Sequence, residues 1–293
     1  MADFYQKQDI DFKTKNFKNE YMLLDTIIGE GSSGFIYTCK SIKENKIYAL
    51  KCLEDDEMSV AEIHFLQKCR DKEHLISLKD VFYNKGFLQE QSEGEKYFYL
   101  VMEIMDGNLQ EKTLQGITES TAAYLAREVA LGLLELHGLG IIHRDIKLEN
   151  VLYKNTTLED GQSHIQVMLV DFGLAVEERN KPTDPIYTVY YGAPEIIALD
   201  TELNPELVYS TPYDHRVDIW SFGVLVYMLL SKLQPPFNDV TESLTGHVDF
   251  PEPTWSNISD DARNLICHIL QSGPEKRPSL EEILVHPWFN ILQ

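Results

Sequence analysis

The amino-acid sequence predicts an α+β protein with two lobes, a β-rich first part followed by an α-helical second part. Three observations support this prediction. Residues 21–103 contain short runs of β-branched and aromatic residues, separated by glycine-containing or polar turns. After Gly107, apolar residues recur at helical spacing instead. The chain of 293 residues is also long enough to form two packed lobes.

The change of pattern divides the chain into four parts. A β-rich lobe is expected over 21–103 and a helical lobe over 104–289, with a hinge near 103–107. Residues 1–20 are polar, rich in lysine and without clear periodicity, and they are interpreted as an N-terminal extension. Residues 290–293 form the C-terminal end.

Each element is expected from its local pattern. Strands are predicted at 21–28, 35–41, 47–53, 77–83 and 97–103, and a surface hairpin loop at 84–96. Asp55 or Asp56 can cap a helix that runs to about Cys69. In the second lobe the clearest amphipathic helices are predicted at 120–139, 217–231 and 260–270.

Charge and composition exclude several classes of protein. The formal net charge of −21 argues against nucleic acid and anionic membranes as partners, and it is compatible with basic protein substrates. The longest apolar run, 222–230, is too short to span a bilayer and is expected as a buried helix. The four cysteines form no CxxC pair, and the N-terminus lacks a secretory apolar region. We expect a cytoplasmic monomer, with the nucleus as an alternative location.

Residues 29–34 fit the pattern GxGxxG, with the members Gly29, Glu30, Gly31, Ser32, Ser33 and Gly34. Such a match alone is weak, because glycine-rich turns are common. A dinucleotide-binding loop opens a helix, whereas residues 35–39 are predicted to return as a strand. A glycine hairpin between two strands can instead lay backbone N–H groups over a triphosphate.

Lys51 lies in a predicted strand, on the same face as the apolar residues Ile47 and Ala49. An edge lysine that extends its amine to water is one interpretation. The other is a lysine that binds an anion and pairs with a carboxylate, for which Glu62 in the next helix is the candidate.

Residues 143–150 contain the strongest signal, His-Arg-Asp-Ile-Lys-Leu-Glu-Asn. Asp145 can accept or orient the proton of a substrate hydroxyl, Lys147 can neutralise a migrating phosphoryl group, and Asn150 can bind magnesium. A simple turn after a helix would explain one of these polar residues but not the set. Asp171 follows an apolar strand, where a carboxylate is costly unless it binds a cation such as Mg²⁺.

The order and spacing of these motifs, with Asp-Phe-Gly at 171–173 and Ala-Pro-Glu at 193–195, resemble the eukaryotic protein-kinase domain over about residues 21–289. The resemblance implies a bilobal kinase fold, the cofactors ATP and Mg²⁺, and protein substrates. It implies that Ala49 and Leu152 enclose the adenine. It further implies an ATP site that includes the glycine loop, Lys51, Ile36, Met102, Glu103 and Met105, and an ion pair between Glu195 and Arg277.

Lys147 and Thr188 resemble the serine/threonine type, and the end of the second lobe is most similar to the calcium/calmodulin-dependent group. The expected function is therefore transfer of the γ-phosphate of ATP to Ser or Thr. The alternative from another class is a nucleotide-binding pseudokinase scaffold, but the residues at 51, 145 and 171 that pseudokinases generally lose are present. A small-molecule kinase of related fold is a third option, but such enzymes lack the Ala-Pro-Glu segment.

Several features depart from the family pattern. The interval from Lys51 to Glu62 is short (62 − 51 = 11 residues), Tyr187 stands where a glycine is usual, and about a dozen extra residues lie around 199–211. The resemblance also implies that Glu149 favours basic residues before the target hydroxyl.

By the same resemblance, Arg144 implies an activation segment held by a phosphorylated residue, but the position that corresponds to this residue is Asp184. Two readings stay open: Asp184 replaces the phosphate, or Asp184 is a solvated loop residue and Thr183 is the phosphorylation site.

Overall fold

The computed structural model describes residues 6–31, 34–88, 91–92, 94–157, 161–200, 203, 211–239 and 241–292, without the side chains of Gln8, Asp25 and Glu30. The described residues form two compact units. The first contains the chain up to Lys72 together with Ile76–Met105, and the second contains Glu73–Leu75 and the chain from Asp106 onward. The predicted boundary after Glu103 lies two residues before the last residue of the first unit.

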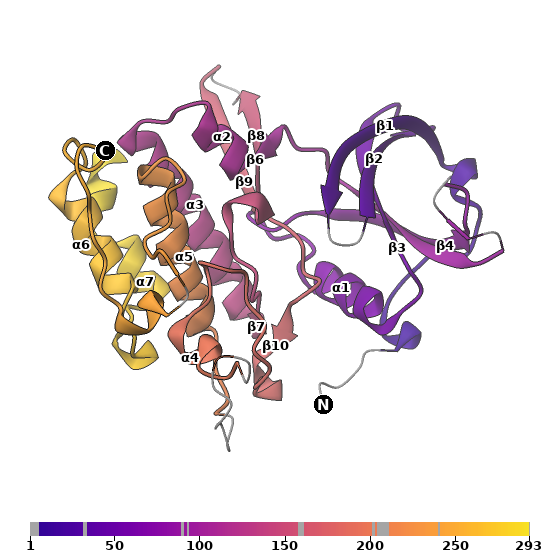
Figure 1. Cartoon of the computed structure of the whole chain (residues 1–293). Helices are drawn as coiled ribbons and strands as arrows, with labels where there is room; N and C mark the ends of the chain where they lie inside the picture. The colour runs from indigo at the N-terminus through magenta and orange to yellow at the C-terminus, as the bar shows by residue number, and fades with distance from the viewer. Residues whose placement is uncertain are drawn as a thin grey trace. The chain divides into compact units, whose positions relative to one another are not determined.

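The first unit is an antiparallel sheet with one long helix (Figure 1). Its strand order is β1-β2-β3-β5-β4. The strands are β1 (Tyr21–Gly31), β2 (Gly34–Ser41), β3 (Ile47–Leu53), β4 (Leu78–Lys85) and β5 (Lys96–Met102). Helix α1 (Glu57–Lys68) begins after Asp56, whose side chain accepts a hydrogen bond from the Ser59 N–H at 2.8 Å, and ends at Cys69. The predicted strands and helix are therefore present, with ends shifted by up to three residues.

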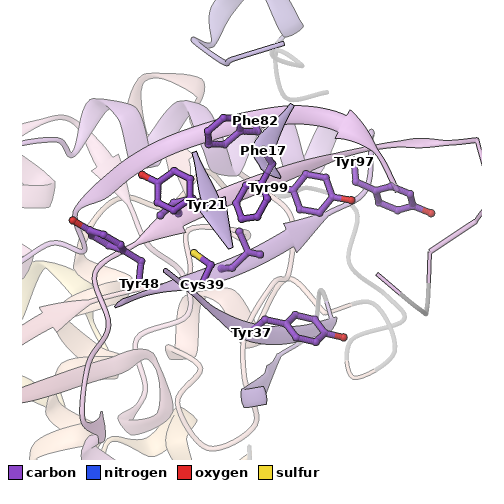
Figure 2. Close-up of a cluster of buried hydrophobic side chains, with 10 residues drawn as sticks. Phe17, Tyr21, Tyr37, Cys39, Tyr48, Phe82, Tyr97 and Tyr99 are labelled. Carbon is purple, nitrogen blue, oxygen red and sulfur yellow. The ribbon is translucent and has the colours of Figure 1, made fainter. Parts of the chain in front are cut away.

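An aromatic core covers one face of this sheet (Figure 2). Tyr48 and Leu50 of β3 belong to it, with Cys52 packed against it, as strand alternation predicts for residues on the face opposite Lys51. The other members come from the four remaining strands, β1, β2, β4 and β5, and from the N-terminal segment: Phe17, Tyr21, Tyr37, Cys39, Phe82, Tyr97, Tyr99 and Val101.

Two segments that the sequence indicates as an extension and as a surface loop are packed on this core. Phe17, in the predicted N-terminal extension, is fully buried and stacks on Tyr21 at 5.4 Å. Phe87, in the predicted surface loop, stacks on Tyr99 with 4.3 Å between ring centroids. The polar residues around them suggest an extension and a surface loop, but Phe17 and Phe87 each have a large apolar area to bury.

The second unit is mainly helical. Its α-helices are α2 (Leu109–Leu114), α3 (Glu119–Gly138), α4 (Pro194–Ile197), α5 (Arg216–Leu230), α6 (Asp260–Ile269) and α7 (Leu280–Leu284). Two small sheets accompany them, one of β6 (Gly107–Asn108), β8 (Val151–Thr157) and β9 (Ser163–Leu169), the other of β7 (Ile141–Ile142) and β10 (Val176–Glu177). Helix α5 is buried along almost its whole length, as its apolar run predicts. Most of the insertion expected at 199–211 lies outside the described residues.

Short 3-10 turns complete both units, at Lys7–Asp9, Phe17–Asn19, Leu148–Asn150, Glu178–Asn180, Glu242–Thr245, Pro274–Lys276 and Pro287–Leu292. None of the helices in the described part of the chain has both the length and the apolar composition that crossing a membrane requires.

Candidate active site

One buried carboxylate, that of Asp218, fixes the backbone of the loop that follows β7. Asp218, at the start of α5, has no exposed surface and accepts hydrogen bonds at 2.8 Å from the backbone N–H groups of His143 and Arg144. The ring of His137 contacts the same carboxylate at 2.9 Å. Burial by itself raises the pKa of Asp218, but the hydrogen bonds from His137 and His143 outweigh it, so the pKa lies below its usual value. The Asp218 carboxylate thus fixes the backbone of the loop that leads into Asp145.

Asp145 is the centre of a set of polar contacts within this loop. Lys147 Nζ donates to Asp145 Oδ2 at 2.7 Å, and Thr188 Oγ1 donates to Oδ1 at 2.5 Å. Lys147 also lies 3.5 Å from the Thr188 hydroxyl. Asn150 Nδ2 donates to Asp145 Oδ2 at 2.7 Å and to its backbone carbonyl at 3.0 Å. The structure therefore brings three sequence-predicted residues and Thr188 into one cluster.

Asn150 and Asp171 occupy adjoining chain segments. Val151 pairs with Leu169 in the β8–β9 ladder, and the Val170 N–H donates to the Asn150 carbonyl at 3.0 Å. Because the Asn150 side-chain nitrogen donates to Asp145, its amide oxygen is the atom suited to bind a cation. Asp171 has a left-handed backbone, with φ 64°. These oxygen donors fit the ligand preference of Mg²⁺.

The ring of Phe172 is fully buried against His143, with 5.2 Å between ring centroids. His143 Nε2 donates to the Val170 carbonyl at 3.0 Å, and its Nδ1 accepts from the Asp145 N–H at 3.3 Å. These contacts tie the strand before Asp171 to the loop that contains Asp145.

In the first unit, Lys51 Nζ bonds to Glu62 Oε1 at 2.7 Å. Glu62 is 3% exposed, so the carboxylate of α1 is buried with its cationic partner. The predicted pair is present, and the interpretation of Lys51 as an edge lysine reaching water is wrong.

The predicted nucleotide-binding residues of this unit lie on neighbouring strands. Gly31 pairs with Gly34 at the tip of the β1–β2 hairpin, Gly29 pairs with Ile36, and Ala49 lies opposite Met102. Ser32, Ser33 and the Glu30 side chain are outside the described residues. The Glu103 N–H contacts the Ser77 carbonyl at 3.4 Å, and Met105 ends the unit. Leu152 belongs to β8 of the second unit, where it pairs with Met168.

The segment after Asp171 is attached to Arg144. The guanidinium Nη1 contacts Asp184 Oδ2 at 2.5 Å and the Tyr213 hydroxyl at 3.0 Å, and Nε donates to the Leu174 carbonyl at 2.6 Å. The Tyr213 hydroxyl in turn donates to the Asp184 carbonyl at 3.0 Å. Thr183, the other phosphorylation candidate, is exposed.

The Tyr187 side chain occupies space beside Gly192 that is free because glycine has no side chain. A Cβ atom on the buried Gly192 would lie 2.7 Å from Tyr187 Cδ2 and 2.9 Å from its Cγ. The Tyr187 hydroxyl donates to Asp200 at 2.9 Å. The unusual tyrosine is therefore matched by a glycine five residues later, and the two form a complementary pair beside Thr188.

Glu195 and Arg277 form the predicted ion pair, with two contacts of 2.6 and 2.7 Å. The Arg277 side chain is fully buried and lies over the Trp220 ring at 5.0 Å. Two further residues of the site, Asp218 and Tyr213, had no assigned role from the sequence. A carboxylate at the start of the otherwise apolar helix α5 is the signal that identifies Asp218. No local pattern identifies Tyr213, because its partner Arg144 is 69 residues away.

Among the described residues, Glu178, Asp214 and His215 also bring three possible metal ligands within 4.8 Å. Hydrogen bonds within the protein explain why these three side chains lie close together. His215 Nδ1 contacts Glu178 at 2.7 Å, and Asp214 accepts from the Arg216 N–H at 3.0 Å.

Comparison with known proteins agrees with this geometry. Residues 23–289 match the protein kinase domain family model, and the chain belongs to that family. It is a serine/threonine protein kinase similar to the calcium/calmodulin-dependent group, as the sequence motifs indicate.

Among its relatives is MAP kinase-activated protein kinase 2 of Drosophila melanogaster, 31% identical over 94% of this chain and 75% of the relative. The Homo sapiens protein of the same name is 29% identical over 97% of this chain and 70% of that protein. MAP kinase-activated protein kinase 5 of Mus musculus is 31% identical over 90% of this chain and 59% of that protein.

Proposed function

We propose that this kinase transfers the γ-phosphate of Mg·ATP to Ser and Thr hydroxyls of proteins, with Asp145 as the catalytic base. The observation that supports this most directly is the hydrogen-bonded cluster of Asp145, Lys147, Thr188 and Asn150. A carboxylate with one oxygen bonded by a threonine hydroxyl is also placed to accept a substrate hydroxyl. In the reaction the hydroxyl oxygen bonds to the γ-phosphorus, the bond from that phosphorus to the β–γ bridging oxygen breaks, and the hydroxyl proton passes to Asp145.

The remaining residues bind and orient. Lys147, next to Asp145, places a positive charge where the phosphoryl group moves. We assign the metal to Asn150 and Asp171, where Mg²⁺, when bound, neutralises charge on the phosphates. Lys51, oriented by Glu62, holds the nucleotide phosphates. The glycine hairpin, Ile36, Ala49, Met102, Glu103, Met105 and Leu152 form the rest of the ATP site in this proposal.

The proposed substrates are proteins with basic residues before the target hydroxyl. Glu149 and the net charge of −21 support this preference. We further propose a cytoplasmic monomer, with nuclear presence as the alternative, that engages neither nucleic acid nor membrane. The absence of CxxC pairs and the acidic composition support these assignments.

We also propose that Asp184 replaces a phosphorylated residue. Its ion pair with Arg144, and the Tyr213 hydroxyl that contacts both residues, support this role. The relatives named above are called MAP kinase-activated, but an aspartate that is already paired with Arg144 makes added phosphate at this position unnecessary.

Phosphate transfer from Mg·ATP to an arrayed peptide library tests the chemistry. Wild-type protein should phosphorylate Ser or Thr peptides. Lys51→Met and Asp171→Ala should abolish transfer, and Asp145→Asn should reduce kcat by about a thousand-fold, because charge neutralisation and positioning supply most of the catalysis. Val285→Ala, at an 81% exposed position, is the control and should match the wild type. Robust transfer by Asp171→Ala would contradict its metal role.

A further inference from the structure

The first unit contains a segment that the proposed chemistry leaves without a role. Residues 6–20, here called the N-terminal strap, belong to the segment 1–20 that the sequence indicates as an N-terminal extension without clear periodicity. In the structure Ile10 and Phe17 of the strap are buried, with exposed fractions of 6% and 0%. Lys13 pairs with the outer edge of β4, since its N–H donates to the Val81 carbonyl at 2.8 Å and its carbonyl accepts from the Tyr83 N–H at 2.9 Å. The strap is therefore fixed to the sheet.

The same strap contacts α1 at its last turn. Gln67 Oε1 accepts a hydrogen bond from the Asp11 N–H at 2.9 Å, and Gln67 Nε2 donates to the Asp11 carbonyl at 2.6 Å. One amide side chain thus bonds both backbone groups of a strap residue, as a neighbouring strand would. Figure 1 shows the N-terminal segment beside α1.

A second contact lies just before α1 begins. Lys7 forms an ion pair with Asp55, the residue before the helix cap Asp56, and donates to the Tyr83 hydroxyl at 2.9 Å. Phe12, which follows Asp11 in sequence, packs edge-on against Tyr83 with 5.5 Å between ring centroids. The strap therefore joins both ends of α1 to strand β4.

The position of α1 matters because Glu62 lies in its middle. Glu62 reaches Lys51 at 2.7 Å only while the helix keeps its place against β3. The interval between these two residues is short, so little chain is available to form further helix turns. From these contacts we propose that the N-terminal strap is a built-in brace that holds α1 where Glu62 pairs with Lys51, with Gln67 as the positioning residue. This inference rests on the proposed role of the Lys51–Glu62 pair in binding ATP.

Gln67→Met tests the brace, because methionine keeps the length and volume of the side chain but loses both hydrogen bonds. We expect a rise in KM for ATP of about five-fold or more and a smaller change in kcat, since the helix and Lys51 become less well ordered before ATP binds. Backbone amides of α1 should exchange hydrogen faster, while the midpoint of thermal unfolding changes little. A purely structural role would lower the midpoint and leave KM for ATP unchanged.

The control on the same helix is Met58→Ala, at a 62% exposed position that should leave KM, kcat and α1 exchange at wild-type values. Gln67→Ala is the second variant and should reproduce the Gln67→Met result. Wild-type KM for ATP and wild-type α1 exchange in Gln67→Met would overturn the brace.

Lys51→Met, measured beside these variants, separates this inference from the proposed function. If Lys51→Met is inactive while Gln67→Met behaves as wild type, the brace is wrong and the ATP role of Lys51 stands. If Lys51→Met is active, the proposed role of the pair is wrong, and hydrogen exchange of α1 still decides whether the strap holds the helix.

Discussion

At the scale of single residues, the contact between Arg144 and Asp184 is the basis of the proposal that Asp184 replaces a phosphorylated residue. Arg144 has a left-handed backbone, with φ 68°, and its side chain is 8% exposed. Its contacts with Asp184, Leu174 and Tyr213 therefore use a cation that is almost removed from water. A buried cation requires an anionic partner. Here the partner is the side chain of Asp184, an ordinary residue of the chain that needs no modification to be charged.

Asp184→Asn keeps the size of the side chain but removes its charge. We expect kcat/KM to fall about ten-fold, because the guanidinium loses a charge-assisted contact that holds the segment. The measurement is peptide phosphorylation by protein expressed in bacteria, with and without phosphatase treatment, which should leave the wild type fully active. Thr183→Ala is the matched neighbour and should be unaffected. Activity that disappears with phosphatase and in Thr183→Ala, but survives in Asp184→Asn, would show that Thr183 is the phosphorylation site.

At the scale of elements, the segment Glu73–Leu75 is joined to α3 by one histidine. His74 Nε2 contacts Glu128 and its Nδ1 contacts Glu135, both at 3.2 Å, and the backbone N–H of His74 donates to Glu135 at 3.1 Å. The hydrogen bond to Glu128, aided by Glu135, raises the pKa of His74 above its ordinary value, although burial opposes it. The imidazolium is thus stabilised by two carboxylates from one face of α3.

This pair of contacts predicts a pH-dependent stability. Because the pKa of His74 is raised in the folded state, its stabilisation is complete below the unfolded pKa of about 6.5 and is lost as the pH rises through the folded value. His74→Gln should lower the free energy of unfolding by about 2 kcal/mol near pH 6 and by less at alkaline pH. Urea unfolding at several pH values measures this difference, with Glu73→Gln as the control. A difference that stays constant over the whole pH range would exclude a charged His74.

At the scale of the whole molecule, the charge is unevenly distributed along the chain. Residues 106–293 contain 28 acidic and 12 basic residues, a net −16, whereas residues 1–105 contain 19 acidic and 14 basic residues, a net −5. The proposed catalytic loop therefore belongs to the more acidic part of the chain. Such a field attracts basic peptides and weakens as salt screens it.

A peptide with arginine before its serine should consequently be phosphorylated with a strong salt dependence. We expect kcat/KM to fall about ten-fold between about 0.05 M and about 0.3 M NaCl, where the Debye length shortens to less than the spacing of surface charges. A peptide with neutral residues at the same positions should change little over this range. Equal salt dependence for both peptides, or a requirement for acidic residues, would refute the basic preference.

Much of the fold was predictable because its signals are local. Strand β3 agrees with its predicted bounds, since alternation of Lys51 with Leu50 and Cys52 is visible within seven residues. The cluster around Asp145 was also predictable, because Asp145, Lys147 and Asn150 lie within six residues of one another. Their spacing leaves few ways to place three polar side chains in one loop.

The contacts of the N-terminal strap and of Tyr213 could not be predicted, because both depend on partners far away in sequence. Phe17 is one aromatic residue among lysines and asparagines, and only the open face of the sheet explains its burial. The packing of Tyr187 against Gly192 could not be predicted for the same reason, because nothing in the sequence shows that the backbone brings these two residues together.

The sequence by itself determined the class of this protein, the order of its elements and the residues proposed for its chemistry, because motif spacing and periodicity are properties of neighbouring residues. The tertiary structure alone decided that Arg144 is paired with Asp184, that Asp218 bonds to the backbone of His143 and that the strap reaches α1. These contacts join residues 40, 75 and 56 positions apart. Which distant polar groups meet is decided by how the buried surfaces pack, and no local pattern records that outcome.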